Sequence, residues 1–449
     1  MYSLDPDIFA QRRADLIDRI GEESVAIFTA SPHQTRSKDT RFPYRPSSDI
    51  LYLTGFREPE TVVVLAPGHE DGDFFMFVRP RDDDAERWDG RRPGPEGACE
   101  DWGADQAWPV DDVDDKLPEL LAGRDTLYYT LGNDSEFDAR VTRWLNELRH
   151  RRGKPPAAPK QLVDARDIIH EMRLRKRPAE LELMREAADV SAQAHELAMK
   201  YCRPGIREYE LQAIIEYHFQ RHGSEFPAYP SIVGSGDNAT ILHYNENRDT
   251  IEPEDLILID AGCELEFYAG DITRCFPASG EFSPAQRDVY QAVLEIQKAA
   301  LDEAEPGMNL DDLQSNCERR TTRALIDLGL LEGSVDELVE EEAFKQYFPH
   351  KIGHWLGIDV HDVGPYRHTD GSWRTFEAGM ALTVEPGIYI PESDESAPDE
   401  LRGIGVRIED DIVFTSQGHE NLTDHCPKSI DDLEDIVGTE DIDTVLPVP

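Results

Sequence analysis

The chain has 449 residues, 39% of them hydrophobic, and carries a formal net charge of −46. This length exceeds one ordinary hydrophobic core, so we expect two domains, and the acidic surface excludes nucleic acid and anionic membranes as partners because both would be repelled. The charge is typical of a solubilising surface or of adaptation to high salt, where screening relieves self-repulsion, and the composition leaves both readings open.

The N-terminal segment M-Y-S-L-D-P-D-I-F-A-Q-R-R has neither a basic region nor an apolar region of the kind found in secretory signals. No apolar stretch approaches the length of a membrane span. The cysteines show no C-x-x-C spacing, which favours free thiols in a reducing compartment; they are Cys99, Cys202, Cys263, Cys275, Cys317 and Cys426. We therefore expect a cytoplasmic protein without a membrane partner.

The first 150 residues alternate strand-like and helix-like runs, which predicts a small N-terminal α/β domain over residues 1–172. Runs of β-branched and aromatic residues bordered by Pro, Gly or Asp predict strands over residues 24–29, 49–54, 60–66, 73–78 and 126–131. A helix should follow, because apolar side chains recur there at helical spacing: Phe137, Val141, Trp144, Leu145 and Leu148. The basic, proline-bearing residues 149–160 predict a connector or surface loop.

The second domain is expected over residues 173–440. Pro178 suits the first turn of a helix, and a long amphipathic stripe runs from Leu181 to the Pro204–Gly205 pair. From there a repeated pattern continues to about residue 425. The acidic tail from residue 430 onward predicts partial disorder.

The second domain contains three pairs of matching segments. E-P-E-D-L-I-L-I-D-A-G at 252–262 and E-A-G-M-A-L-T-V-E-P-G at 377–387 put Asp260 and Glu385 in equivalent places. Asp271 and Glu409 each stand five residues before a Phe, on runs that are typical of short strands. P-G-I-R-E-Y-E-L-Q and P-G-M-N-L-D-D-L-Q each open a helical pattern. Such matches predict a duplicated α+β domain, with its helices packed behind the strands and four acids brought together in the concave face of the sheet.

Four carboxylates that converge on a buried point repel one another, so they require a cation or shared protons. Carboxylate oxygens suit Mg²⁺ or Mn²⁺, and an added imidazole shifts the preference toward transition metals. Imidazoles are available at His243, His350, His354 and His361. A single acid on a strand is more often solvated or capping than metal-binding, so the metal hypothesis depends on the whole set.

The motifs around these residues resemble those of the pita-bread metallopeptidases, and within that family they look most like bacterial aminopeptidase P, the Xaa-Pro aminopeptidases. The motifs are D-A-G, D-I-T-R, G-H-W-L-G-I-D-V-H-D, T-V-E-P-G-I-Y and R-I-E-D, and they contain Asp260, Asp271, His354, Glu385 and Glu409 in chain order. The stretch Y-R-P-S-S-D-I-L-Y-L-T-G-F-R-E-P-E is similar to the N-terminal domain of that family. The resemblance therefore covers nearly the whole chain, whereas metal-free relatives such as creatinase lack the full ligand set.

The resemblance implies two Mn²⁺ ions per chain, with other divalent ions left open. Asp260 and Asp271 would hold one ion, His354 and Glu385 the other, and the carboxylates of Asp271 and Glu409 would span both. Two cations in this arrangement hold a bridging hydroxide and polarise the carbonyl of a peptide bond. Glu385 is also a candidate proton shuttle.

The resemblance also assigns roles outside the ligand set. His243 and His361 match positions that hydrogen-bond the substrate and the developing oxyanion, and His350 matches one that lines the pocket. Arg407 stands two residues before Glu409, so it shares a strand face with that acid and is expected to pair with a carboxylate near the cluster. Simpler readings remain for two of them: His361 as a turn cap and Arg407 as a structural ion pair.

The implied function is a metallo-aminopeptidase that hydrolyses the N-terminal Xaa-Pro bond of peptides whose second residue is proline. The resemblance also implies a homo-oligomer, either a dimer or a tetramer. Two alternatives stay open. One is an Xaa-Pro dipeptidase, which activity on dipeptides against tripeptides would reveal, and the other is a non-catalytic binding protein with this fold, which metal analysis would reveal.

Overall fold

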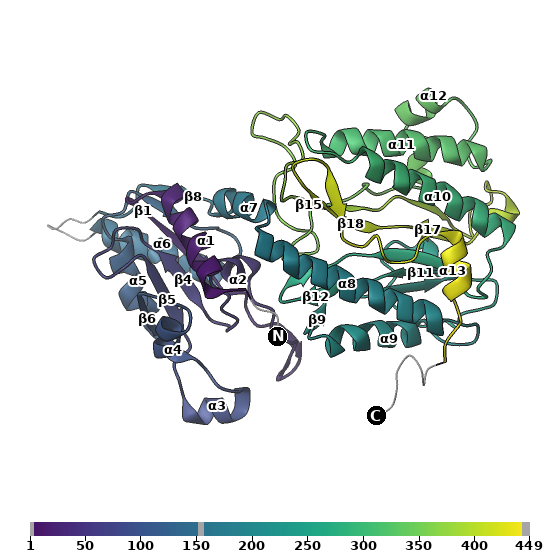
Figure 1. Ribbon diagram of the computed structural model, residues 1–449. Helices are drawn as coiled ribbons and strands as arrows, with labels where there is room; N and C mark the ends of the chain where they lie inside the picture. Colours follow the sequence, from purple (N-terminus) through teal and green to yellow (C-terminus); the bar gives the residue numbers. More distant parts are fainter. Residues whose placement is uncertain (1–3, 151–156, 442–449) are drawn as a thin grey trace. The chain divides into compact units, whose positions relative to one another are not determined.

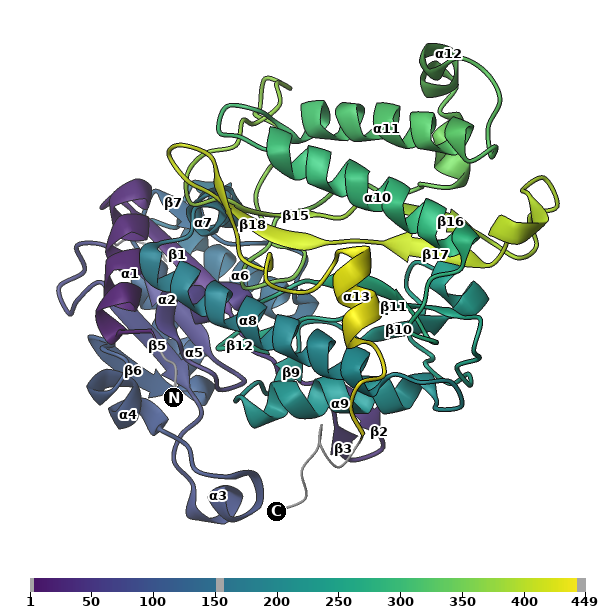
Figure 2. The ribbon, with the colours of Figure 1, turned by 45° about the vertical axis from the view of Figure 1, so that its right-hand side comes forward.

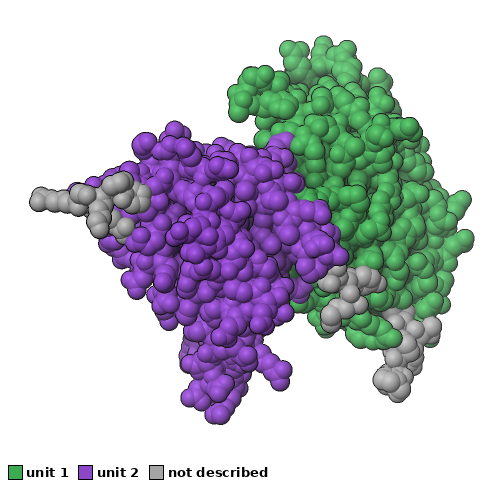
Figure 3. Space-filling view, turned by 60° about the vertical axis from the view of Figure 1, so that its left-hand side comes forward, with its two compact units in different colours: residues 1–3, 174–449 green, residues 4–173 purple. Residues whose placement is uncertain are grey.

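The structure is a computed structural model that describes residues 4–150 and 157–441. The chain divides into two compact units, one of residues 4–173 and one that begins at residue 174 (Figure 3). Each unit has a hydrophobic core of its own. No helix in the described ranges combines the length and the apolar character needed to cross a bilayer.

The first unit is built on a six-stranded mixed sheet in the order β6-β5-β4-β1-β7-β8. Its strands are β1 (Ser24–Thr29), β4 (Val62–Leu65), β5 (Phe74–Val78), β6 (Gln106–Pro109), β7 (Thr126–Tyr128) and β8 (Gln161–Val163). The interior strands β4 and β5 are buried along their whole length, as expected for an apolar strand covered on both faces. A separate hairpin pairs β2 (Thr35–Ser37) with β3 (Thr40–Arg41).

Helices complete the first unit (Figure 1). They are α1 (Pro6–Ile20), α2 (Ser48–Thr54), α3 (Asp83–Asp89), α4 (Gly94–Glu100), the 3₁₀ turn η1 (Val110–Asp112), α5 (Val113–Leu121), α6 (Ser135–His150) and α7 (Arg166–Leu174). In α6 the predicted apolar stripe is buried at Phe137, Val141, Trp144 and Leu148. The predicted helix is therefore confirmed, as are four of the five predicted strands.

The strand predicted over residues 49–54 is wrong, because this segment forms helix α2. Five consecutive residues, Ile50 to Thr54, are buried, and a short run that is buried on all sides has no period that distinguishes strand from helix. The helix signals lie at its ends. Gly55 adopts φ 67° and donates its N–H to the Leu51 carbonyl, which is a typical helix stop.

Two further expectations need correction. The basic segment 149–160 does not join the two units, because the chain that follows it adds β8 beside β7 in the first unit; residues 151–156 of this segment lie outside the described residues. The acidic tail is not irregular from residue 430, since Ile430–Ile436 form helix α13 with Ile430 and Leu433 buried. Residues 442–449 also lie outside the described residues.

The second unit contains two long helix pairs with the strands between them (Figures 1 and 2). Its helices are α8 (Pro178–Tyr201), α9 (Glu208–Arg221), α10 (Pro284–Glu303), α11 (Leu310–Asp327), α12 (Val335–Glu340) and α13, with 3₁₀ turns η2 (Gly236–Thr240), η3 (Ala343–Gln346) and η4 (Asp399–Leu401). Helix α8 begins with Pro178 at its first turn, as predicted. The helices α9 and α11 follow the two matching P-G segments, which confirms that both segments open helices.

The strands of the second unit form small antiparallel sheets. The sheets are β10-β11-β14, β13-β12-β9, β15-β18-β19 and β16-β17. The strands are β9 (Phe226–Pro227), β10 (Ile232–Ser235), β11 (Leu256–Asp260), β12 (Cys263–Leu265), β13 (Tyr268–Ala269), β14 (Thr273–Pro277), β15 (Ala381–Val384), β16 (Gly387–Ile390), β17 (Ile404–Arg407), β18 (Asp410–Phe414) and β19 (His419–Asn421).

The two halves of this unit repeat one plan, a helix pair followed by an antiparallel strand pair. β11 pairs with β14 in the first half, and β15 pairs with β18 in the second. An isolated antiparallel bridge between Thr273 and Glu409 joins the halves directly. Asp271 and Glu409 precede β14 and β18 rather than lying within them, so their expected placement on strands is off by one or two residues.

Candidate active site

The four predicted carboxylates stand at strand ends that converge at the junction of the two halves. Asp260 is the last residue of β11 and Glu385 follows the last residue of β15, while Asp271 and Glu409 come just before β14 and β18. The apolar residues of β11 and β15 are buried, which anchors each strand in the core up to its carboxylate. The duplicated pattern thus brings the four acids to one place.

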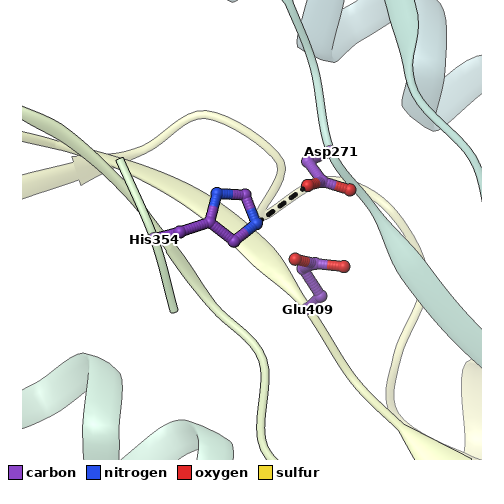
Figure 4. A group of neighbouring side chains, drawn as sticks. All are labelled: Asp271, His354 and Glu409. Atoms are coloured by element: carbon purple, nitrogen blue, oxygen red, sulfur yellow. Dashed lines mark ion pairs between the residues drawn. The ribbon is translucent and has the colours of Figure 1, made fainter. Parts of the chain in front are cut away.

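Asp271, His354 and Glu409 form the tightest group, with one ligand atom from each lying within 4.8 Å of the others (Figure 4). Nε2 of His354 is 3.4 Å from Oδ2 of Asp271 and 3.6 Å from Oε1 of Glu385. The three side chains of the group arise from different segments and point at one another (Figure 4). Such convergence of carboxylates and an imidazole makes this group a candidate metal centre.

The electrostatics of the group favour a cation. Burial raises the pKa of Glu409 well above its usual range, and the charge of Asp271 adds to the increase. Burial also raises the pKa of Glu385, to about 7. For His354, burial alone would lower the pKa, but the hydrogen bond to Asp271 and the charge of Glu385 outweigh it and raise the pKa to about 9. These residues therefore fit a divalent metal, whose charge removes the need for protons at the acids.

Two side chains hold Asp260: Arg407, which the sequence predicted to pair with an acid, and Tyr229, which it did not predict. The hydroxyl of Tyr229 lies 2.6 Å from Oδ1 of Asp260 and also contacts Oδ1 of Asp271. Nη2 of Arg407 donates a 2.5 Å hydrogen bond to Oδ2 of Asp260. Nε of Arg407 donates to the hydroxyl of Thr273 at 3.1 Å. The structure therefore places Arg407, which is buried, against an acid of the cluster.

A chain of hydrogen bonds leads from Arg407 to His350. Nη1 of Arg407 donates to the hydroxyl oxygen of Tyr389 at 3.0 Å, and that hydroxyl is 2.7 Å from Nε2 of His350. Nδ1 of His350 is 2.8 Å from the carbonyl oxygen of Lys351, which can only accept. Burial, with the nearby charge of Arg407, lowers the pKa of His350 to about 3. His350 is therefore neutral, donating from Nδ1 and accepting from Tyr389 at Nε2.

His243 and His361 are exposed and line the same cavity as the carboxylates, which has a volume of about 860 Å³. The His361 ring packs edge-on against the His354 ring, with centroids 4.3 Å apart. Burial and the neighbouring His354 lower the pKa of His361. The cavity thus has carboxylates at its floor and imidazole groups on its wall, so every residue of the predicted site lies in or beside one cavity.

Sequence reasoning missed several residues that support the site, and the most connected of them is Asp410. Its buried carboxylate accepts hydrogen bonds from Arg274, Gln297, Asn421, Thr423 and Lys428. Arg274 is also buried and donates to the carbonyl of Glu409. These contacts connect residues up to 136 positions apart, and a single sequence carries no signal for them. Thr273 could have been found, because it follows Asp271 by two residues in D-I-T-R.

Known proteins resemble the chain over almost its whole length. The model of metallopeptidase family M24 matches residues 182–416, and that of the aminopeptidase P N-terminal domain matches residues 9–128. The Xaa-Pro aminopeptidase of Escherichia coli K12 is 44% identical and covers 97% of this chain and 98% of its own length. Human Xaa-Pro aminopeptidase 3 is 34% identical, covering 93% of this chain and 81% of itself.

Solved structures agree with this result. Pseudomonas aeruginosa aminopeptidase PepP superposes with a TM-score of 0.94 at 48% identity, covering 97% of this chain and 98% of that one. Zn-substituted E. coli aminopeptidase P in complex with product gives 0.93 at 43% identity, with the same coverage. The expected fold, an N-terminal α/β domain followed by a pita-bread α+β domain, is confirmed by these likenesses. With matches over nearly its whole length, the chain belongs to metallopeptidase family M24 and, within it, to the aminopeptidase P group.

Proposed function

We propose that the protein is a metallo-aminopeptidase that hydrolyses the first peptide bond of substrates beginning Xaa-Pro. The observation that carries the proposal is the convergence of Asp271, His354 and Glu409, with Glu385 and Asp260 beside them, at the floor of one cavity. Relatives that align over nearly the full chain are Xaa-Pro aminopeptidases, and this supports the same activity here.

Five residues would hold the metal, for which we propose two Mn²⁺ ions. They are Asp260, Asp271, His354, Glu385 and Glu409. A pair of divalent cations supplies, when bound, activation of a water molecule and polarisation of the scissile carbonyl. Zn²⁺ and other divalent ions suit the same donors, so the proposal of Mn²⁺ is to be tested by metal analysis and activity measurements.

The remaining residues of the cavity have separate tasks in the proposed reaction. Glu385 lies between His350 and His354, at 3.7 Å and 3.6 Å, and is placed to carry a proton from water to the leaving prolyl nitrogen. His361 and His243 are exposed on the cavity wall and would donate to the carbonyl oxygen as negative charge develops there. Arg407 orients Asp260 directly and Glu409 through Thr273.

The cavity also suits a proline ring. A prolyl nitrogen has no hydrogen to donate, so its pocket needs apolar walls rather than an amide acceptor. Apolar and aromatic side chains line the cavity beside the histidines, namely Ile232, Leu242, Leu310, Val360, Tyr366 and Trp373. The carboxylate floor would attract a free N-terminal ammonium. Both features favour a peptide that has a free amino terminus and proline as its second residue.

Peptide length separates this proposal from its nearest alternative. The purified protein, supplied with Mn²⁺, should release Ala from Ala-Pro-Ala faster than it cleaves the dipeptide Ala-Pro. Faster hydrolysis of the dipeptide would make the protein a prolidase instead. Metal binding without turnover of either peptide would identify a non-catalytic binding protein.

The cellular setting remains a prediction from sequence. The six cysteines are free thiols in the structure, five of them buried, in keeping with the expected reducing cytoplasm. The homo-oligomer, a dimer or tetramer, is likewise a prediction. Solution scattering would test the oligomeric state, and cell fractionation would test the location.

A further inference from the structure

Two exposed cations, Lys351 and Arg367, line the active-site cavity. Lys351 and Arg367 are exposed, and neither forms an ion pair with any residue in the ranges 4–150 and 157–441. Other partly exposed cations of this acidic chain do reach carboxylates, as Arg175, Arg185 and Arg320 do. In the cavity, Lys351 and Arg367 are therefore available to a negatively charged ligand.

The structure holds the guanidinium of Arg367 in a defined place. Residues 366–374 form a hairpin in which Arg367 pairs with Trp373. The guanidinium carbon lies 3.6 Å from the centre of the Trp373 ring, and Nη1 donates to the Gly371 carbonyl at 2.8 Å. The hairpin's own acid, Asp370, accepts from Ser372 instead. Stacking uses the face of the guanidinium and leaves its edge N–H groups available to bind a carboxylate in a fork.

Charge is distributed unevenly along the cavity. Asp260, Asp271, Glu385 and Glu409 lie at its floor, whereas Lys351 and Arg367 line it together with one acid, Asp311. A short peptide has the complementary polarity, since its ammonium is at the cleaved end and its carboxylate is at the other. The cavity volume of about 860 Å³ lies in the upper part of the range of roughly 300–1,000 Å³ that holds drug-sized ligands, so it has room for residues beyond the proline.

We propose that Lys351 and Arg367 form a subsite that binds a carboxylate downstream of the proline. The carboxylate belongs either to the C-terminus of a tripeptide or to an acidic side chain at the third position. This inference rests on the proposed aminopeptidase function, because it places the scissile bond at the carboxylate floor. It names the preferred substrates as short or acidic Xaa-Pro peptides.

Three peptides distinguish the sources of the carboxylate: Ala-Pro-Ala, its C-terminal amide, and Ala-Pro-Glu amide. With Mn²⁺ present, we expect kcat/KM to be about tenfold higher for Ala-Pro-Ala than for its amide, because a charge-assisted hydrogen bond is lost with the charge. Rescue by Ala-Pro-Glu amide would extend the subsite to side chains, and failure to rescue would restrict it to the C-terminus. Equal kcat/KM values for Ala-Pro-Ala and its amide in the parent protein would overturn the subsite.

The variants Arg367→Gln and Lys351→Gln, and the double variant, should reduce the ratio of kcat/KM between acid and amide toward one. The change should appear mainly in KM. Because the ratio is taken within one preparation, poor folding of a variant cancels. Arg367→Lys should keep part of the ratio, and Arg323→Gln, an exposed arginine on α11 outside this cavity, should keep all of it. An unchanged ratio in the double variant would refute the assignment.

Equilibrium binding separates this inference from the proposed function. Ala-Pro-Ala should bind the metal-free protein more tightly than its amide does, and this difference should vanish in the double variant. If no peptide is cleaved but the binding difference is found, the aminopeptidase proposal fails and the carboxylate subsite stands. If peptides are cleaved with no preference for the acid over the amide, the aminopeptidase proposal stands and the carboxylate subsite fails.

Discussion

The hydroxyl of Thr273 donates a 2.6 Å hydrogen bond to Oε2 of Glu409, although the two residues belong to opposite halves of the second unit. The backbone N–H of Glu409 in turn donates to the carbonyl of Thr273 at 3.1 Å. A second contact joins their neighbours: the backbone N–H of Asp271, two residues before Thr273, donates to the buried carboxylate of Asp411, two residues after Glu409. The proposed ligands Asp271 and Glu409 are therefore fixed relative to each other by the protein itself, before any metal binds.

This arrangement predicts that the junction depends on the buried pair Arg274–Asp410, whose side chains are both 0% exposed. Asp410→Ala would leave the Arg274 guanidinium buried without its carboxylate, so we expect a loss of roughly 3–5 kcal/mol in the free energy of unfolding. Urea denaturation of the metal-free protein measures the change.

The matched control is Asp336→Ala, which removes an acid paired with Arg319 on the surface, where the side chains are 81% and 52% exposed. We expect that variant to change stability by less than about 1 kcal/mol. Equal effects of the two substitutions would show that the Arg274–Asp410 pair does not hold the junction together.

Metal removal gives a second prediction. Exhaustive chelation should abolish peptide cleavage, and the protein should regain activity on binding about two divalent ions per chain, with Mn²⁺ the best activator, because the proposed donors are four carboxylates and one imidazole. Metal analysis and activity are measured on the same samples. Full activity in the chelated protein would rule out the metal mechanism.

His361 provides a third prediction. His361→Ala should lower kcat by on the order of a hundredfold while metal content stays near that of the parent, because the exposed imidazole would stabilise the oxyanion without holding an ion. His368→Ala, an exposed histidine of the neighbouring hairpin, serves as the control. Loss of metal from the His361 variant would make His361 a ligand instead.

A buried histidine predicts the response of stability to acid. His195 is fully buried on α8, its Nε2 lies 2.9 Å from the Ala261 carbonyl, and burial lowers its pKa to about 4. The unfolded chain takes up this proton near the ordinary pKa of about 6.5. Stability should therefore be lost progressively as pH falls from about 6.5 to 4, by up to roughly 3 kcal/mol from this group.

The measurement is the unfolding midpoint of the metal-free protein across that range. His195→Gln removes the proton uptake, so its stability should fall less steeply with acid than that of the parent. Parallel curves for the two proteins would assign the acid sensitivity to other groups.

Local patterns predicted much of this structure. The helical spacing of Phe137, Val141, Trp144 and Leu148 predicted α6 because one face of that helix is buried. The segment Ile50–Thr54 was misread because tertiary burial on every side removed its period. The residues that converge at the cavity could be named from the sequence because each lies in a local motif, and their role as metal ligands stays a prediction. Tyr229, Asp410 and Asp411 were not, because their roles come from contacts with distant parts of the chain.

The most direct test of the central claim is to measure which bond the Mn²⁺-loaded protein cleaves, and how fast, in Ala-Pro-Ala, Ala-Ala-Ala and N-acetyl-Ala-Pro-Ala. Product analysis should find Ala and Pro-Ala from the first peptide, with a large loss of rate when Ala replaces proline or when the amino group is acetylated. Comparable rates on Ala-Pro-Ala and Ala-Ala-Ala would contradict the proline specificity.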